Sequence, residues 1–193
     1  GSKERRFTQR IMQVAFRHYI ENRQPIVINT FSMGAWATGL NTTLSLVGVS
    51  RIKSTGPDIT KVLDSLVELG STYEYVIAGY PPFLKQIADS EIINWNEYKI
   101  SAIYGGEGIS ESMRTALLKK YINVVGSYGA SDLEINIAHE SDFTIALRRA
   151  IAEDESLRKA LLAQNRGVIP SVFQYNPYDY VIETNQNGEL IVT

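Results

Sequence analysis

Two glycine-containing segments hold the residues of this sequence that are best suited to bind a ligand. The first contains Gly105-Gly106-Glu107, and the second runs from Tyr128 to Asp132. Glycines let a ligand approach the backbone, a tyrosine ring can stack on a flat base, and a carboxylate can hold a divalent cation beside a phosphate. Neither segment matches the phosphate-binding loop or the dinucleotide fingerprint, so the residues alone leave open whether they form a nucleotide site or ordinary turns.

The elements that must position these segments alternate between strands and helices. Four short runs are apolar throughout, which is typical of strands covered on both faces, and helix-like stretches separate them. This order predicts an α/β fold, a mostly parallel sheet flanked by helices. Ligands of such sheets bind at the carboxyl ends of the strands, where both glycine segments fall. The expected strands are 26–28, 75–78, 100–104 and 122–125, and the expected helices are 5–22, 83–88, one from Asp58 to Gly70, one from Ser110 to about Tyr121, and one within 30–47 after a loop.

The pattern changes after Asp142. A helix-like stretch reaches about Gln164 with a break near Asp154, and a β-hairpin is expected around Asn187-Gly188, because an Asn-Gly pair supplies the positive φ angles of a tight turn. The chain therefore divides into an α/β part, residues 3–141, and a small β-rich C-terminal part, residues 142–193. Residues 1–2, Gly-Ser, are expected to be the remnant of a purification tag.

Composition excludes several classes of function. The 193 residues contain no cysteine, which rules out disulfides, thiolate metal sites and a cysteine nucleophile, and they contain only two histidines. The net charge of -2 argues against binding to a nucleic-acid backbone. No apolar run approaches the ~20 residues that cross a membrane, and no signal segment opens the chain. We therefore expect a cytoplasmic protein with neither a nucleic-acid nor a membrane partner; a homodimer is left open.

Four separated stretches resemble one known family. They are "VIAGYPPFLKQIAD", "YGGEGISESMRTALLKKY", "VVGSYGASDLE" and the terminal "GELIVT". In this order they resemble the acyl-adenylate-forming enzymes, the AMP-dependent synthetases and ligases, and especially the phenylacetate–CoA ligase-like branch. The resemblance spans nearly the whole chain. It implies that residues 3–141 form a nucleotide-binding subdomain and that residues 142–193 are a helix and hairpin of the same adenylation domain.

The resemblance implies a role for each matching residue. The Gly105-Gly106-Glu107 turn would lie along the adenine of ATP or of the acyl-adenylate, and Tyr128 would stack on that adenine. Asp132 stands where the family usually has Glu and would bind Mg²⁺ with an arm shorter by one methylene. The other implied cofactor-binding residues are Ser127, Gly129 and Ser131, the last as a hydrogen-bond partner of the phosphate.

A second group of residues is a weaker candidate for the pocket of the carboxylic acid substrate. It consists of Phe31, Met33, Gly34 and Trp36, although apolar residues in such a stretch more often belong to the core. Catalytic residues cannot be named from the sequence. His18 is expected on the surface of the first helix and His139 on a loop, and neither is required by the resemblance.

The resemblance implies an ATP-dependent ligase that activates a carboxylic acid, with coenzyme A as co-substrate. The family's phosphate loop, its ribose-binding aspartate and the C-terminal domain with the catalytic lysine have no counterpart in the 193 residues. We therefore expect an internal fragment of the large N-terminal domain that does not catalyse adenylation alone. Two alternatives remain open: a non-catalytic nucleotide- or partner-binding α/β module, and an unrelated doubly wound enzyme with Glu107 or Asp132 as general base.

Overall fold

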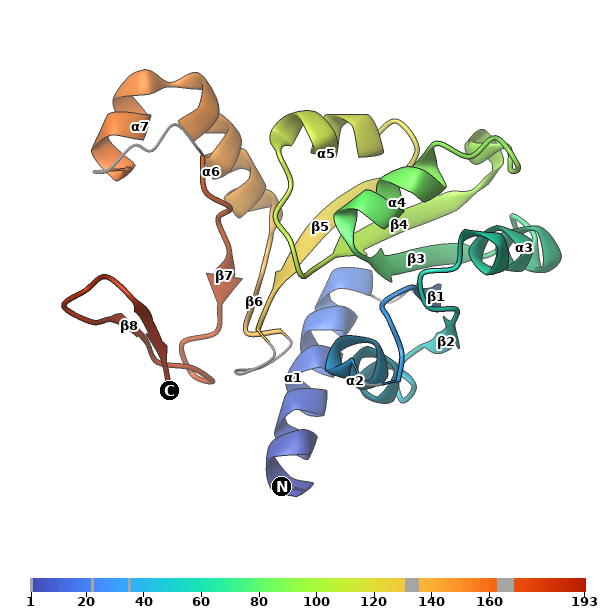
Figure 1. Ribbon diagram of the computed structural model, residues 1–193, viewed down its shortest axis with the longest axis horizontal. Helices are drawn as coiled ribbons and strands as arrows, with labels where there is room; N and C mark the ends of the chain where they lie inside the picture. The colour runs from blue at the N-terminus through green and yellow to red at the C-terminus, as the bar shows by residue number, and fades with distance from the viewer. Residues whose placement is uncertain (1, 22, 35, 131–135, 163–168) are drawn as a thin grey trace.

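A seven-stranded sheet forms the centre of the computed structural model, which describes residues 2–21, 23–34, 36–130, 136–162 and 169–193 (Figure 1). The strand order is β2-β1-β3-β4-β5-β6-β7. The first five strands pair in parallel, and β6 and β7 add on as an antiparallel edge. The strands are β1 (Ile26–Asn29), β2 (Arg51–Ser54), β3 (Glu74–Gly79), β4 (Lys99–Tyr104), β5 (Asn123–Tyr128), β6 (Ala138–His139) and β7 (Gln174–Tyr175).

Helices cover both faces of the parallel part. Successive strand residues point to opposite faces, so Ile26 and Ile28 pack with one set of helices and Val27 packs with the other. The first set is α3 (Ile59–Leu69), α4 (Pro81–Ala88) and α5 (Glu111–Leu117), and the second is α1 (Ser2–Ile20) and α2 (Ala37–Leu46). The remaining elements are η1 (Trp95–Glu97), α6 (Asp142–Glu153), α7 (Glu155–Leu161), and the hairpin of β8 (Ile182–Thr184) and β9 (Leu190–Val192). The predicted α/β fold with a C-terminal hairpin is confirmed.

Local signals set several helix ends as predicted. The Asp58 side chain accepts a hydrogen bond from the backbone N–H of Lys61 at the start of α3, which then ends at Gly70 with φ 78°. Ser110 caps α5 in the same way, and Asp154 both ends α6 and caps α7. These side chains satisfy N–H groups that have no partner inside the helix. The short polar residues in this sequence therefore determine where these helices begin.

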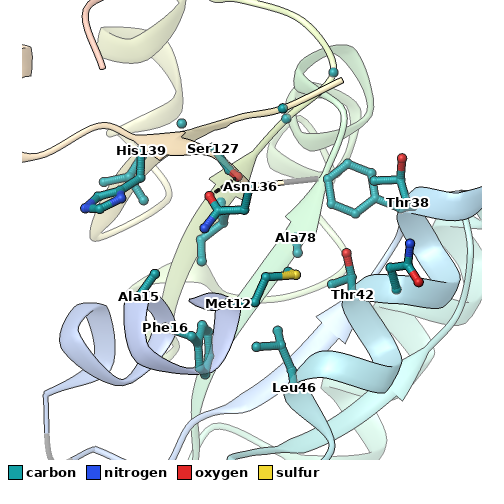
Figure 2. A pocket seen from close by; sticks show the side chains of 18 of the residues that line it. Met12, Ala15, Phe16, Thr38, Thr42, Leu46, Ala78, Ser127, Asn136 and His139 are labelled. Atoms are coloured by element: carbon teal, nitrogen blue, oxygen red, sulfur yellow. Dashed lines mark hydrogen bonds between the residues drawn. The ribbon is translucent and has the colours of Figure 1, made fainter. Parts of the chain in front are cut away.

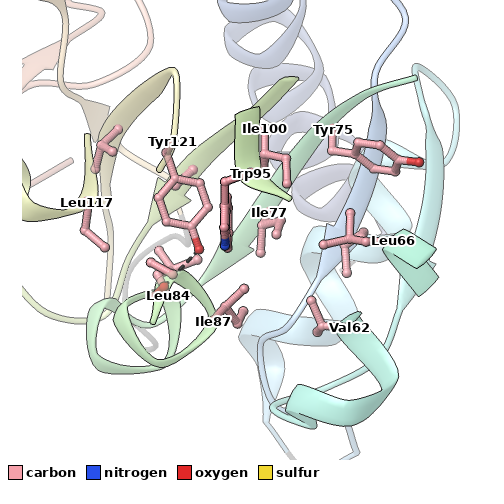
Figure 3. Packing of buried hydrophobic residues seen from close by; sticks show 14 of the residues in the cluster. Val62, Leu66, Tyr75, Ile77, Leu84, Ile87, Trp95, Ile100, Leu117 and Tyr121 are labelled. Atoms are coloured by element: carbon pink, nitrogen blue, oxygen red, sulfur yellow. Dashed lines mark hydrogen bonds between the residues drawn. The ribbon is translucent and has the colours of Figure 1, made fainter. Parts of the chain in front are cut away.

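The α3–α4–α5 face is a packed apolar core (Figure 3). Ile77 of β3 and Leu84 of α4 are completely buried in it. Tyr121 packs edge-on against Trp95 at 5.4 Å between ring centroids and donates its hydroxyl to the Leu84 carbonyl at 2.9 Å. Large side chains interlock here because the interior of a protein is packed as densely as an organic crystal.

Three features differ from the sequence-based expectation. Residues 51–54, expected between turn residues, form β2, an edge strand whose side chains are mostly exposed and therefore lack the apolar run of a buried strand. The predicted helix up to about Tyr121 ends earlier, at Leu117. His139, expected on a loop, lies in β6, a two-residue strand too short to be recognised by periodicity. Within the described part of the chain, no helix is both long and apolar enough to cross a membrane.

Candidate functional site

A cavity of about 570 Å³ lies between the sheet and the helices α1 and α2, and it reaches the carboxyl ends of the central strands (Figure 2). Its volume is in the range of small-molecule sites. Three groups of residues line it. The strands contribute Val27, Val76, Ala78, Ile103, Val125, Gly126, Ser127 and His139; the helices contribute Met12, Ala15, Phe16, Tyr19, Ala37, Thr38, Asn41, Thr42 and Leu46; the loops contribute Phe31, Trp36, Tyr80, Gly105, Gly106, Gly129, Ala130, Asn136 and Glu140.

The loop between β1 and α2 is held against the sheet by two buried polar side chains. The Thr30 backbone N–H and hydroxyl both donate to the Ala78 carbonyl at 2.8 Å. The Asn29 amide donates to the Gly39 carbonyl at 2.8 Å and to the Thr43 hydroxyl at 2.9 Å. Because buried polar groups are costly without partners, these bonds hold the loop that carries Phe31 into the cavity wall.

The turn after β4 brings bare backbone to the cavity. Gly106 has φ 82°, a conformation that favours glycine. A Cβ atom there would also lie 2.5 Å from the Tyr80 ring, which itself packs edge-on against Phe31 with centroids 5.1 Å apart. Gly105 donates its N–H to the Gly79 carbonyl at 3.3 Å and so continues the sheet. Glycine is thus required at Gly106 for conformation and for space, and these residues together form one wall of the cavity.

The end of β5 and the turn that follows it provide the polar part of the same wall. Ser127 donates its hydroxyl to the Asn136 side-chain oxygen at 2.7 Å, and both residues line the cavity. Tyr128 points elsewhere: its ring packs against Phe173 with centroids 5.3 Å apart, and it is 38% exposed. The turn therefore presents its serine and its glycine, Gly129, to the cavity.

A buried ion pair supports the base of this turn. Arg114 donates to the Glu140 carboxylate and to the Val124 carbonyl, both at 2.6 Å, and the Gly126 N–H donates to the other Glu140 oxygen at 2.8 Å. Although burial lowers the pKa of Arg114, the hydrogen bond and charge of Glu140 raise it overall. Burial, followed by the charge of Glu140, raises the pKa of Tyr104, whose ring lies against Gly126. The pair joins β5 to α5 and to the segment that precedes α6.

A second cluster of charges ties α5 to α6. Glu111 accepts from Arg114 at 3.2 Å, from Arg148 at 2.9 Å and from Arg149 at 3.0 Å. Burial raises the pKa of Glu111, but the hydrogen bond from Arg149 and the charges of the other two arginines hold it below its usual value. Arg148 also donates to the Pro170 carbonyl at 3.1 Å. The cluster thereby fixes the described segment after α7 relative to the sheet.

His139 is a cavity residue that the sequence did not single out. Burial, followed by the charge of His18, lowers the pKa of His139, so its imidazole is neutral near pH 7. Three more lining residues were not predicted from the sequence as site residues: Tyr80, Asn136 and Glu140. Tyr80 has a usable signal, because it directly follows β3 and strand-end residues line such sites. The others come from a segment whose two-residue strand leaves no periodic pattern.

The structure brings together six of the twelve sequence-predicted site residues. Those that line the cavity are Gly105, Gly106, Ser127, Gly129, Phe31 and Trp36. Glu107 is exposed beside it, and Tyr128, Met33 and Gly34 are not among the lining residues. Ser131 and Asp132 lie outside the described residues. Within the described part of the chain, no three His, Asp or Glu side chains gather as a metal site would require.

The chain was compared with families, curated proteins and solved structures. No family model matches it, and no curated protein does. Among solved structures, a mutant of the amide bond synthetase Mcba from Marinactinospora thermotolerans aligns over 95% of this chain with a TM-score of 0.56 and 13% identity. ATP-bound MatB from Rhodopseudomonas palustris aligns over 69% with a TM-score of 0.52 and 16% identity. A four-domain nonribosomal peptide synthetase bound to AMP and glycine aligns over 69% with a TM-score of 0.53 and 15% identity.

The chain shares the fold of part of each of these three proteins. It covers 34%, 26% and 10% of the three structures, so it corresponds to a segment of each. Identities this low establish a common fold, and the roles of individual residues depend on the geometry of the site.

Proposed function

We propose that this chain is part of an ATP-dependent ligase that activates a carboxylic acid as its adenylate. The observation that carries the proposal is that the Gly105-Gly106 turn after β4, together with Ser127 and Gly129 at the end of β5, lines one cavity. In a parallel sheet this is the edge where nucleotides bind. The likeness in fold to ATP-bound and AMP-bound ligases supports the same class of reaction.

The Gly105-Gly106 turn is the proposed contact for the adenine ring, because both glycines line the cavity at a strand end. Tyr128 follows the lining residue Ser127, and stacking on the purine would require its ring to turn from Phe173 toward the cavity. Ser127 supplies a hydroxyl at the cavity. We further propose Ser131 as a phosphate contact and Asp132 as the Mg²⁺ ligand. The cation would neutralise charge on the phosphates.

In the reaction, a carboxylate oxygen of the substrate attacks the α-phosphorus of ATP, a P–O bond forms, and pyrophosphate leaves. The nucleophile belongs to the substrate, so the protein acts mainly by positioning and by neutralising charge. This accounts for a cavity built from backbone, hydroxyl and amide groups. Coenzyme A is the proposed acceptor in the next step, as in the phenylacetate–CoA ligase-like branch. The chain alone is proposed to bind nucleotide without turnover.

Nucleotide binding can be measured by titration calorimetry of the chain with Mg²⁺–ATP. Tyr128→Ala removes the proposed stacking partner and should weaken ATP binding about tenfold, since stacking on an aromatic side chain contributes roughly 1–3 kcal/mol per base. Tyr178→Ala is the matched control, because Tyr178 is 96% exposed. Asp132→Ala should reduce the dependence of binding on Mg²⁺, and Asp64→Ala, on the exposed side of α3, should not.

Unchanged ATP binding in both Tyr128→Ala and Asp132→Ala would remove the proposed site. The proposal that the chain alone binds nucleotide without turnover is tested by ATP–pyrophosphate exchange with a panel of acids. Robust exchange by the chain alone would refute it. ATP binding without exchange in the full-length protein would instead support the alternative of a non-catalytic nucleotide-binding module.

A further inference from the structure

We infer that the end of the cavity between α1 and α2 binds the hydrocarbon part of the substrate, and that the acid therefore carries an uncharged apolar group. This inference rests on the proposed function, because it names the class of acid that the proposed ligase would activate. It concerns the part of the cavity away from the glycine turns. We call this part the apolar end and define it by Met12, Ala15, Phe16, Leu46 and Val76.

The cavity has two chemically different ends. Figure 2 shows Met12, Ala15, Phe16 and Leu46 together on the side of the helices. Ser127, Asn136 and His139 lie on the other side, which is continuous with the glycine turns. A ligand spanning both ends needs a polar head at the turns and an apolar body between the helices and the sheet. An acyl-adenylate has this division, with its mixed anhydride at the boundary.

The charges on the described walls of the cavity disfavour acids with a second ionised group. Among the described lining residues there is no Lys or Arg, and Glu140 is the only carboxylate. Its two oxygens are already bound by Arg114 and by the Gly126 N–H, and its side chain has no exposed surface. Nothing on the described walls offers an opposite charge to the ammonium of an amino acid or to a second carboxylate. A buried charge without a partner is strongly disfavoured.

The described walls also suggest which residues limit the size of the acid. Ala15 is the smallest lining residue of α1, and it sits one helical turn from Met12, so that the two share one face of the helix. A larger side chain at Ala15 would project into the space that the acid is inferred to fill. The adjacent Val14 is 62% exposed and is not a lining residue, which makes it a matched control on the same helix.

The test is calorimetric titration of the chain with butanoate, hexanoate, octanoate and octanedioate. Affinity should rise about fourfold for each added methylene while the chain still fits. Octanedioate should bind at least about tenfold more weakly than octanoate, because its second carboxylate would enter the apolar end. Equal affinity for octanoate and octanedioate, or no dependence on chain length, would overturn the inference.

Two variants locate the binding. Ala15→Phe should weaken octanoate binding about tenfold or more, whereas Val14→Phe should leave it unchanged. Met12→Lys should weaken octanoate binding and strengthen octanedioate binding, so the preference reverses. Circular dichroism checks that each variant is folded, and if Ala15→Phe fails to fold, the reversal in Met12→Lys decides. A folded Ala15→Phe that binds octanoate normally, or a Met12→Lys without reversal, would contradict the assignment.

Titration with Mg²⁺–ATP in the same series separates this inference from the proposed function. ATP binding without any acid binding overturns the apolar end as an acyl site and leaves the nucleotide site standing. Acid binding with the predicted selectivity, but without ATP binding, supports the apolar end and contradicts the proposed ligase.

Discussion

On the α3–α4–α5 side of the sheet, Ile77 and Leu84 pack with aromatic rings from η1 and from the segment after α5 (Figure 3). On the α1–α2 side, Val76, the neighbour of Ile77 in β3, and Ile103 of β4 border a cavity. Alternate residues of a strand face opposite sides, so one backbone supplies both surfaces. The comparison indicates that one face contributes most of the stability, while the other keeps open space for a ligand.

The largest expected effect comes from breaking the ion pair that joins the two faces. Glu140→Gln removes the nearer of the two carboxylates that contact the buried Arg114 and leaves Glu111 at 3.2 Å, and it should cost roughly 3 kcal/mol in the free energy of unfolding. Glu155→Gln is the control, since the Glu155–Lys159 pair on α7 is exposed and its loss should cost no more than about 0.5 kcal/mol. Denaturant unfolding measures both. Equal small losses would mean that the buried pair does not support the turn.

A matched pair of leucines tests the difference between the faces directly. Leu84→Ala in the packed core should cost about 3 kcal/mol or more, and Leu46→Ala beside the cavity should cost about half as much. Both side chains are buried, at 0% and 4% exposure, but Leu46 already borders open space and loses fewer contacts. Urea unfolding midpoints at equal m-values give the comparison. Equal costs would show that the cavity wall is as tightly packed as the core.

The smallest expected effect is on how the free energy of unfolding depends on pH, through the cavity residue His139. Burial and the charge of His18 hold the pKa of His139 below its ordinary value of about 6.5. The unfolded chain then binds more protons below pH 6.5, so the free energy of unfolding should fall as the pH drops from about 6.5 toward the folded-state pKa, and then level off. His139→Gln should remove this contribution. Identical pH profiles of the two proteins between pH 7 and 5 would contradict the assignment.

The sequence was informative wherever a signal was local. Asp58 and Ser110 as helix caps, the break at Asp154, and the Asn-Gly hairpin were all predicted, because each depends on neighbouring residues. The apolar runs of β1, β3, β4 and β5 predicted the parallel sheet, because a strand covered on both faces is apolar throughout. β2 escaped prediction because its side chains are mostly exposed and give no such run.

The glycine residues of the site could be predicted from the sequence, but the residues that reach the cavity from the β6 segment could not. Gly105, Gly106 and Gly129 stood out because glycines after a strand are a local pattern, and they line the cavity. Asn136 and His139 did not, because they reach it through pairing with a strand that lies about ten residues earlier in the chain. The orientation of Tyr128 toward Phe173 is likewise a contact between distant segments.

The sequence by itself therefore determined the kinds and order of the elements, the ends of several helices and the presence of two glycine turns at strand ends. These features follow from backbone conformation and short-range hydrogen bonds, which depend on a few consecutive residues. Only the folded chain established that one face of the sheet is hollow, that the Arg114–Glu140 pair supports its rim, and that α1 closes its apolar end. Those properties arise from packing between segments that are far apart in the sequence.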